Sequence, residues 1–215
     1  FAENRRVERR EDLFLRLEEE GFIINNIIDY TEAENEGFFL EGTGSLLLDR
    51  INKKAYCALS ARANEDLFIE FCEDFDYAPF LFTANQTVDG KRLPIYHTNV
   101  MMCLAEKFAV ICLDSIDDKK ERKLIVNSLK EDGKSIIAIS EAQMHHFAGN
   151  MLQVQGHSNQ RYLVMSQAAH KSLTATQIAE IEKYCPILSS SLETIETCGG
   201  GSARCMMAEV FLPKA

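Results

Sequence analysis

The hydrophobic positions of this chain form a pattern that repeats three times. Pairs of short apolar runs, each pair divided by a polar turn and closed by a serine, lie at residues 44–60, 99–115 and 149–166. Segments with apolar positions at helical spacing follow them, at residues 64–75, 117–130 and 174–183. Another short apolar run comes after each segment, at residues 79–82, 135–139 and 185–188. Paired short runs predict antiparallel strands, so the pattern predicts a ββαβ unit that occurs three times.

Polar residues stand where the predicted helices begin. Ser60, Asn64 and Thr174 are expected to act as helix N-caps, because their side-chain oxygens can accept the free backbone N–H groups of a first turn. Asp117 and Asp118 place negative charge at the positive end of the second predicted helix. Local sequence and hydrophobic spacing therefore agree on all three helices.

The two ends of the chain are predicted to be incomplete units. Residues 3–20 have the pattern of a charged helix and residues 22–28 that of a strand, which together make the second half of a unit. Residues 205–212 have the pattern of an opening strand. We expect one α/β domain over residues 1–215, with units at about 1–30, 38–84, 95–140, 147–190 and 200–215. A closed ring would need more chain, and we expect an N-terminal segment to be missing.

Composition limits the classes of function. The 215 residues include 33 acidic and 23 basic side chains, and the net charge of −10 repels phosphate backbones, which argues against nucleic acid as a partner. No apolar run approaches the roughly 18 residues of a membrane helix, so no membrane partner is expected. The seven cysteines form no CxxC pair, which disfavours a zinc or redox motif and favours a reducing, cytoplasmic setting. No cofactor is predicted.

Candidate chemistry lies in the loops that precede the first strand of each predicted unit. If the units circle a common axis, these loops meet at one end of it, and Glu41, His97 and Cys205 come together although they are far apart in sequence. A thiol, an imidazole and a carboxylate can serve as nucleophile, general base and orienting acid. Each residue also has a purely structural interpretation: Glu41 as a surface acid, His97 as a hydrogen-bonded histidine and Cys205 as a buried thiol.

Two further features bear on the site. Residues 199–201 are three glycines just before Cys205, and glycine permits the positive φ and close backbone approach that an exposed nucleophile needs. His145 and His146 suggest a metal site, but adjacent residues of a strand or helix point in different directions. We therefore predict no metal ligand.

Four motifs carry a resemblance to a known family. The runs FFLEGTGS, IYHTNVMM, HHFAGNML and CGGGSARCMMAEVFLP occur in this order along the chain. They resemble the arginine-deiminase-related branch of the pentein superfamily, and within it the citrulline-utilisation hydrolase type that is often described as an amidinotransferase. The similarity extends over essentially the whole chain. Members of this family carry a further N-terminal stretch, in keeping with the missing segment expected above.

The resemblance implies a fold, a reaction and a set of site residues. The fold would be a five-unit α/β propeller of ββαβ modules around a central active site. Cys205 matches the nucleophile of the family, His97 its general acid and base, and Glu41 its acidic member. The thiol attacks the central carbon of a guanidino or ureido group, forming a covalent adduct that water or an acceptor amine resolves. The expected substrate contacts are Asn99, Asn150, Arg204, Gly200 and Gly201.

One departure from the family pattern affects the expected substrate. Arginine deiminases commonly have an HxD motif whose aspartate binds the guanidinium, whereas Asn99 stands at that position here. An amide can both donate and accept, which suits a neutral ureido group, so citrulline is favoured over arginine. Three alternatives stay open: an arginine deiminase or amidinotransferase with the same triad, a non-catalytic binding protein, and an oligomerising half-propeller that would form a homo-oligomer.

Overall fold

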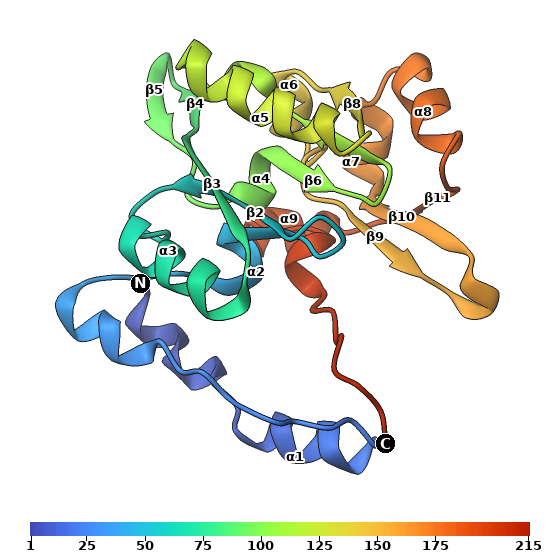
Figure 1. Ribbon diagram of the computed structural model, residues 1–215. Helices are drawn as coiled ribbons and strands as arrows, with labels where there is room; N and C mark the ends of the chain where they lie inside the picture. The colour runs from blue at the N-terminus through green and yellow to red at the C-terminus, as the bar shows by residue number, and fades with distance from the viewer.

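The computed structural model describes residues 1–215, except for the side chains of Arg5 and His157. Three small sheets share one topology, in which an antiparallel strand pair is joined by a helical crossover to a third, parallel strand (Figure 1). The sheets comprise β1 (Leu46–Asp49), β2 (Lys54–Leu59) and β3 (Ala78–Thr83); β6 (Met102–Leu104), β7 (Phe108–Ile111) and β8 (Ser135–Ala138); and β9 (Leu152–Gln155), β10 (Arg161–Ser166) and β11 (Ile187–Ser190). The α/β fold class predicted from the sequence is confirmed.

Helices cross over between the second and third strands of each sheet. They are α3 (Glu65–Phe75), α5 (Lys119–Glu131), and the pair α7 (Gln167–Ser172) and α8 (Ala175–Glu182). The remaining elements are α1 (Asp12–Glu19), α2 (Gly42–Ser45), α4 (Thr98–Met101), α6 (Glu141–Met144), α9 (Glu193–Gly199), the hairpin strands β4 (Asn85–Val88) and β5 (Lys91–Pro94), and the short 3-10 helices η1 (Glu3–Glu8), η2 (Thr31–Glu36), η3 (Leu113–Ser115), η4 (His157–Asn159) and η5 (Arg204–Met206).

Side-chain caps begin the crossover helices. Asn64 accepts the backbone N–H of Leu67 at the start of α3, and Asp118 accepts two backbone N–H groups at the start of α5. Thr174 forms a reciprocal capping box at the start of α8. Ser60 does not cap a helix, and that expectation is wrong. Its hydroxyl donates to the backbone carbonyl of Tyr96, because β2 ends one residue earlier and Ser60 stands in the turn.

The first strands β1, β6 and β9 lie next to one another and bring the three sheets together. In the sheet with the order β6-β7-β8, the middle strand β7 is buried along its whole length. A buried ion pair connects the first sheet to the segment before β8, since Lys134 Nζ lies 2.9 Å from Asp49 Oδ2 and both side chains are at most 3% exposed. Lys134 also donates to the backbone carbonyls of Ala105 and Glu106, so its cation is surrounded by acceptors.

The N-terminal segment differs from the expected single helix and strand. The predicted helix over residues 3–20 is divided into η1 and α1, because Arg9 is extended and its guanidinium binds the Glu34 carboxylate 2.8 Å away. The predicted strand over residues 22–28 does not form. Phe22 makes one isolated bridge to Lys214, which is too little pairing for a ladder.

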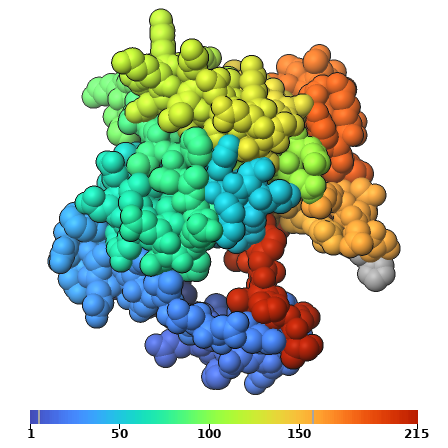
Figure 2. All heavy atoms as spheres, viewed as in Figure 1, coloured from blue at the N-terminus to red at the C-terminus, as the bar shows by residue number. Residues whose placement is uncertain are grey.

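The predicted opening strand over residues 205–212 is also wrong. Its first residues belong to η5, and the rest form no strand. Two backbone hydrogen bonds join residues 21–23 to the C-terminal end, where the Ile23 N–H donates to the Pro213 carbonyl and the Ala215 N–H donates to the Gly21 carbonyl. Figure 2 shows the N-terminal arm, in blue, extending below the body of the molecule to meet the C-terminal end, in red. An apolar run becomes a strand only where a partner lies alongside it.

The buried ion pair of Asp49 predicts a pH-dependent contribution to stability. Burial alone raises the pKa of Asp49, but hydrogen bonds from Asn52 and Lys134 outweigh it and hold the pKa below its usual value. Asp49→Asn leaves the buried Lys134 cation unpaired and should lower the free energy of unfolding by about 3 kcal/mol at pH 7. Asp114→Asn, which removes an exposed partner of Arg122, should cost less than about 1 kcal/mol.

Urea titration of the wild type and both variants measures these differences. A carboxylate with a lowered pKa contributes stability above its unfolded pKa and loses it as the pH falls, so the gap between wild type and Asp49→Asn should shrink below about pH 4. A gap that is absent at pH 7, or that does not change with acidification, contradicts a stabilising role for this pair.

Candidate active site

Glu41 and His97 face each other from two short helical turns. Glu41 immediately precedes α2, His97 immediately precedes α4, and the two turns pack together. The Nε2 atom of His97 lies 2.6 Å from Oε2 of Glu41. Gly44 approaches the imidazole so closely that an added Cβ would stand 2.6 Å from His97 Nδ1. The acid and the imidazole can therefore pair in this way only with glycine at position 44.

The position of α4 is fixed by the residue that follows His97. The hydroxyl of Thr98 is buried, donates to the backbone carbonyl of Ser45 at 2.5 Å and accepts the backbone N–H of Ala58 at 2.8 Å. One side chain thus joins α4 to α2 and to β2. Because Glu41 and His97 lie at the starts of these turns, the same hydrogen bonds hold the pair in register.

The charge state of Glu41 follows from its surroundings. Burial alone raises the pKa of this carboxyl, because it disfavours the charged form. The hydrogen bond and charge of His97, with the Arg62 guanidinium 3.6 Å away, outweigh burial and hold the pKa below its usual value. Glu41 is therefore ionised at neutral pH, and an ionised partner both orients an imidazole and stabilises its protonated form.

Cys205 lies on η5 and is exposed. Two buried asparagines approach its sulfur, with Asn150 Nδ2 at 3.2 Å and Asn99 Nδ2 at 3.8 Å. Asn99 stands two residues after His97 on the same turn. The structure therefore brings the three predicted catalytic residues to one region, where α4 directs His97 toward Glu41 and Asn99 toward the thiol.

Asn150 connects the separate parts of this region. Its side-chain carbonyl accepts the backbone N–H of Arg204 at 3.0 Å, and its amide donates to the backbone carbonyl of Asn99 at 3.1 Å as well as to Cys205. The preceding residue is Gly149, where an added Cβ would stand 2.3 Å from the backbone carbonyl of Val100. Only glycine permits this approach, and it allows Asn150 to reach both α4 and η5.

Asn99 differs from Asn150 in having an unused polar atom. Its amide nitrogen donates to the Thr43 carbonyl at 3.4 Å, but Oδ1 is buried and finds no hydrogen-bond partner within the described part of the protein. A buried acceptor without a partner is costly, and such atoms are typical of sites where a ligand supplies the missing donor. Asn99 therefore carries an unpaired acceptor on the same amide whose nitrogen lies 3.8 Å from the thiol.

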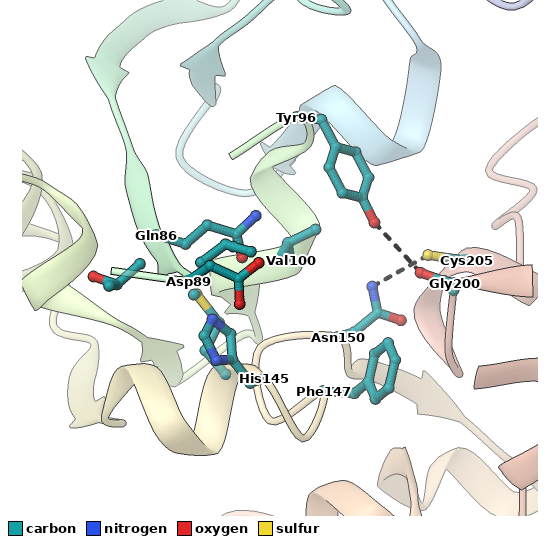
Figure 3. Close-up of a pocket in the computed structure, with 13 residues that line it drawn as sticks. Gln86, Asp89, Tyr96, Val100, His145, Phe147, Asn150, Gly200 and Cys205 are labelled. Atoms are coloured by element: carbon teal, nitrogen blue, oxygen red, sulfur yellow. Dashed lines mark hydrogen bonds between the residues drawn. The ribbon is translucent and has the colours of Figure 1, made fainter. Parts of the chain in front are cut away.

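A cavity of about 430 Å³ opens beside Cys205 (Figure 3). Cys205, Asn150, Gly200 and Gly201 line one side of it, whereas Glu41 and His97 are absent from its described lining. Gly200 has a left-handed φ of +68°, and its carbonyl accepts the Tyr96 hydroxyl at 3.3 Å. The predicted glycine contacts thus lie on the cavity wall, next to the sulfur.

Arg204 is placed differently from the other predicted contacts. Its buried guanidinium donates to the Met207 carbonyl at 2.8 Å and pairs with Glu209 at 3.2 Å, lining a second cavity of about 230 Å³. Only its backbone N–H serves the thiol region, through Asn150. The Arg204 side chain is therefore not among the groups that the structure brings to Cys205.

Sequence reasoning missed the opposite wall of the cavity. Hairpin β4–β5 contributes Asp89 at its turn, and the segment after α6 contributes His145, whereas Phe147 of the same segment lies nearer to Asn150 (Figure 3). The pair Asp89-Gly90 was the available signal, because Asp-Gly between two short strands is typical of a two-residue hairpin turn. Nothing in the local sequence indicates that this turn faces a thiol more than a hundred residues away.

No set of three or more histidine, cysteine, aspartate or glutamate side chains within the described part is arranged to hold a metal ion. None of its helices has both the length and the apolar character needed to cross a bilayer.

Comparison with known structures shows the same fold. The arginine dihydrolase ArgZ of the cyanobacterial ornithine-ammonia cycle is 18% identical with a TM-score of 0.67, over 99% of this chain and 31% of that one. Its N-terminal domain, solved covalently bound to a reaction intermediate, is 19% identical with a TM-score of 0.67, over 99% and 70%. AgrE, solved with ornithine and NAD+, is 23% identical with a TM-score of 0.62, over 82% and 23%.

These structures are pentein enzymes, so the pentein-type α/β fold expected from the four motifs is confirmed. The chain spans less than a third of the length of ArgZ and AgrE. A search of curated proteins finds no match. The family model for eukaryotic N,N dimethylarginine dimethylhydrolase matches residues 1–212. On this match the chain belongs to the N,N dimethylarginine dimethylhydrolase family of the pentein superfamily.

Proposed function

We propose that this chain carries the active site of a cysteine-dependent hydrolase that breaks a C–N bond at the central carbon of a guanidino or ureido group. The substrate is arginine or a derivative of it. The observation that carries the proposal is the position of Cys205 on a cavity, 3.2 Å from Asn150 Nδ2 and 3.8 Å from Nδ2 of Asn99, which lies two residues after His97 on the same turn. The covalent intermediate captured in the ArgZ N-terminal domain supports the same chemistry.

The thiol suits this carbon better than a hydroxyl does. Resonance deactivates guanidino and ureido carbons, so a strong nucleophile is needed, and a thiolate is intrinsically one. The Asn150 amide N–H points at the sulfur and would stabilise a negative charge on it. No metal or other cofactor is needed in this proposal.

Attack by the Cys205 thiolate forms a C–S bond, while the π electrons of a C=N bond move to nitrogen. His97 gives a proton to the departing nitrogen, and the C–N bond breaks with its electrons on that nitrogen, so that ammonia or an amine leaves. Water then adds to the adduct and gives a proton to His97. The C–S bond then breaks as the added oxygen forms a C=O bond and releases its remaining proton to solvent, which restores the thiolate and frees a ureido product from a guanidino substrate.

Asn99 bears on the choice between guanidino and ureido substrates. Its unused atom is Oδ1, an acceptor, and both groups offer N–H donors to it. Its neutral amide still lacks the carboxylate that binds a guanidinium most strongly. The match to the dimethylarginine dimethylhydrolase family favours a guanidino substrate, and we propose one on that ground. The neutral amide of Asn99 keeps citrulline as the second candidate. With an acceptor amine in place of water, the same adduct would serve an amidinotransferase.

The two exposed cysteines provide a direct test of the nucleophile. Cys205→Ala should abolish release of ammonia or amine from arginine, N,N-dimethylarginine and citrulline, because the proposed mechanism assigns the C–S bond to Cys205 alone. Cys198→Ala, which removes the other exposed thiol seven positions earlier, should leave turnover within about twofold of wild type. Ammonia and amine release at neutral pH measure both effects.

The three substrates also separate the candidate reactions. Release from arginine or dimethylarginine supports the guanidino hydrolase, and release from citrulline alone supports the ureido alternative. Turnover that survives in Cys205→Ala contradicts the proposed mechanism.

The close contact at Gly44 predicts a second effect. Gly44→Ala places a methyl group in contact with the His97 ring and must displace it, so kcat should fall by about tenfold to a hundredfold while KM changes little. Gly199→Ala is the matched control, because no atom lies within 4 Å of its added Cβ and its φ is not left-handed. Steady-state kinetics with the preferred substrate measure both variants. Equal kcat values for the two would show that the position of His97 is unimportant.

A further inference from the structure

The cavity beside Cys205 has three chemically different zones (Figure 3). The thiol and the Asn150 amide form one end. Apolar atoms of Val100 and Phe147 form the middle, and Asp89 lies toward the opposite wall with its carboxylate in the cavity lining (Figure 3). A ligand that fills this space would present a reacting group, an aliphatic stem and a polar end in that order.

The hairpin that carries Asp89 is firmly held. Its turn places Asp89 and Gly90 at φ +50° and +74°, the left-handed values that a two-residue turn of this type requires. Arg92 fixes the hairpin to the body, since it binds the carboxylates of Asp117 at 2.7 Å and Glu141 at 3.0 Å. The same Glu141 carboxylate accepts the backbone N–H of Thr87. The position of Asp89 is therefore determined by its surroundings before a ligand arrives.

The Asp89 carboxylate is available to a ligand. Among the described side chains it has neither an ion pair nor a hydrogen-bond partner, although Arg92, three residues on, binds two other carboxylates. The described lining of the cavity contains no lysine or arginine. A carboxylate in this setting attracts a cation from the solvent.

We propose that Asp89 binds the ammonium group at the end of the substrate's aliphatic chain. The inference rests on the proposed function, which places the guanidino carbon at Cys205. From there a methylene stem passes Val100 and Phe147, and the terminal ammonium pairs with Asp89. The substrate class is then a guanidine on an alkyl chain that ends in an amine, as in arginine and agmatine. Asp89 acts as a specificity residue and takes no part in bond breaking.

Two ligands of equal size test the pairing. Agmatine ends in an ammonium group, and pentylguanidine has a methyl group in its place. In a Cys205→Ala background, Asp89→Asn should weaken agmatine binding by about fivefold and leave pentylguanidine within about twofold, with the agmatine effect reduced at about 1 M salt. Calorimetry measures both dissociation constants. In the wild-type background the same substitution should raise KM for arginine and leave kcat nearly unchanged.

Asp76→Asn is the matched control, because Asp76 is also an exposed aspartate with a left-handed φ, at the end of α3 and outside the cavity lining. It should change neither ligand's affinity. Equal weakening of agmatine and pentylguanidine by Asp89→Asn, no weakening of agmatine, or no binding of either ligand overturns the assignment. Failure of the proposed function is recognised separately, as a wild-type protein that turns over no guanidino or ureido substrate while the calorimetric difference at Asp89 persists.

Discussion

The approach of one backbone turn to another, permitted by glycine at two positions, is the constraint on which the candidate site depends. At Gly44 an added Cβ would collide with the His97 ring, and at Gly149 it would collide with the backbone carbonyl of Val100. A side chain at either position would push the turns apart by more than a hydrogen bond tolerates. Glycine is required at these two positions because it has no side chain, and not because of its conformational freedom, since neither residue has a left-handed φ.

Because the turns lie close together, their buried polar groups can form hydrogen bonds with one another. Asn150 satisfies all the polar groups it touches, joining the backbone of Asn99, the backbone of Arg204 and the Cys205 sulfur. A fully satisfied amide of this kind holds its neighbours rigidly, since breaking any contact leaves a buried group unpaired. Asn99 keeps its buried Oδ1 unpaired among the described residues, while its Nδ2 lies 3.8 Å from the thiol. Among the described residues the network is therefore complete except at Oδ1 of Asn99.

The features that sequence analysis predicted correctly are mostly those determined by residues near one another in the chain. The crossover helices begin at Asn64, Asp118 and Thr174 because capping is a property of a few adjacent residues. The convergence of Glu41 and His97 followed from equivalent positions in repeated units, and the structure places them 2.6 Å apart. The strands predicted over residues 22–28 and 205–212 do not form, because strand pairing depends on a partner that is distant in the sequence. Asp89 was missed because its turn signal says nothing about which cavity the turn faces.

The central claim is that Cys205 forms a covalent bond to the carbon that loses nitrogen. Acid quenching of the protein during turnover of its preferred guanidino substrate, followed by intact-mass and peptide mass spectrometry, tests it most directly. The account predicts an adduct whose mass equals that of the substrate minus the leaving ammonia or amine, located on the peptide that contains Cys205 and absent from the peptide that contains Cys198. Product formation with no adduct under any quench time, or an adduct on another residue, would contradict the account.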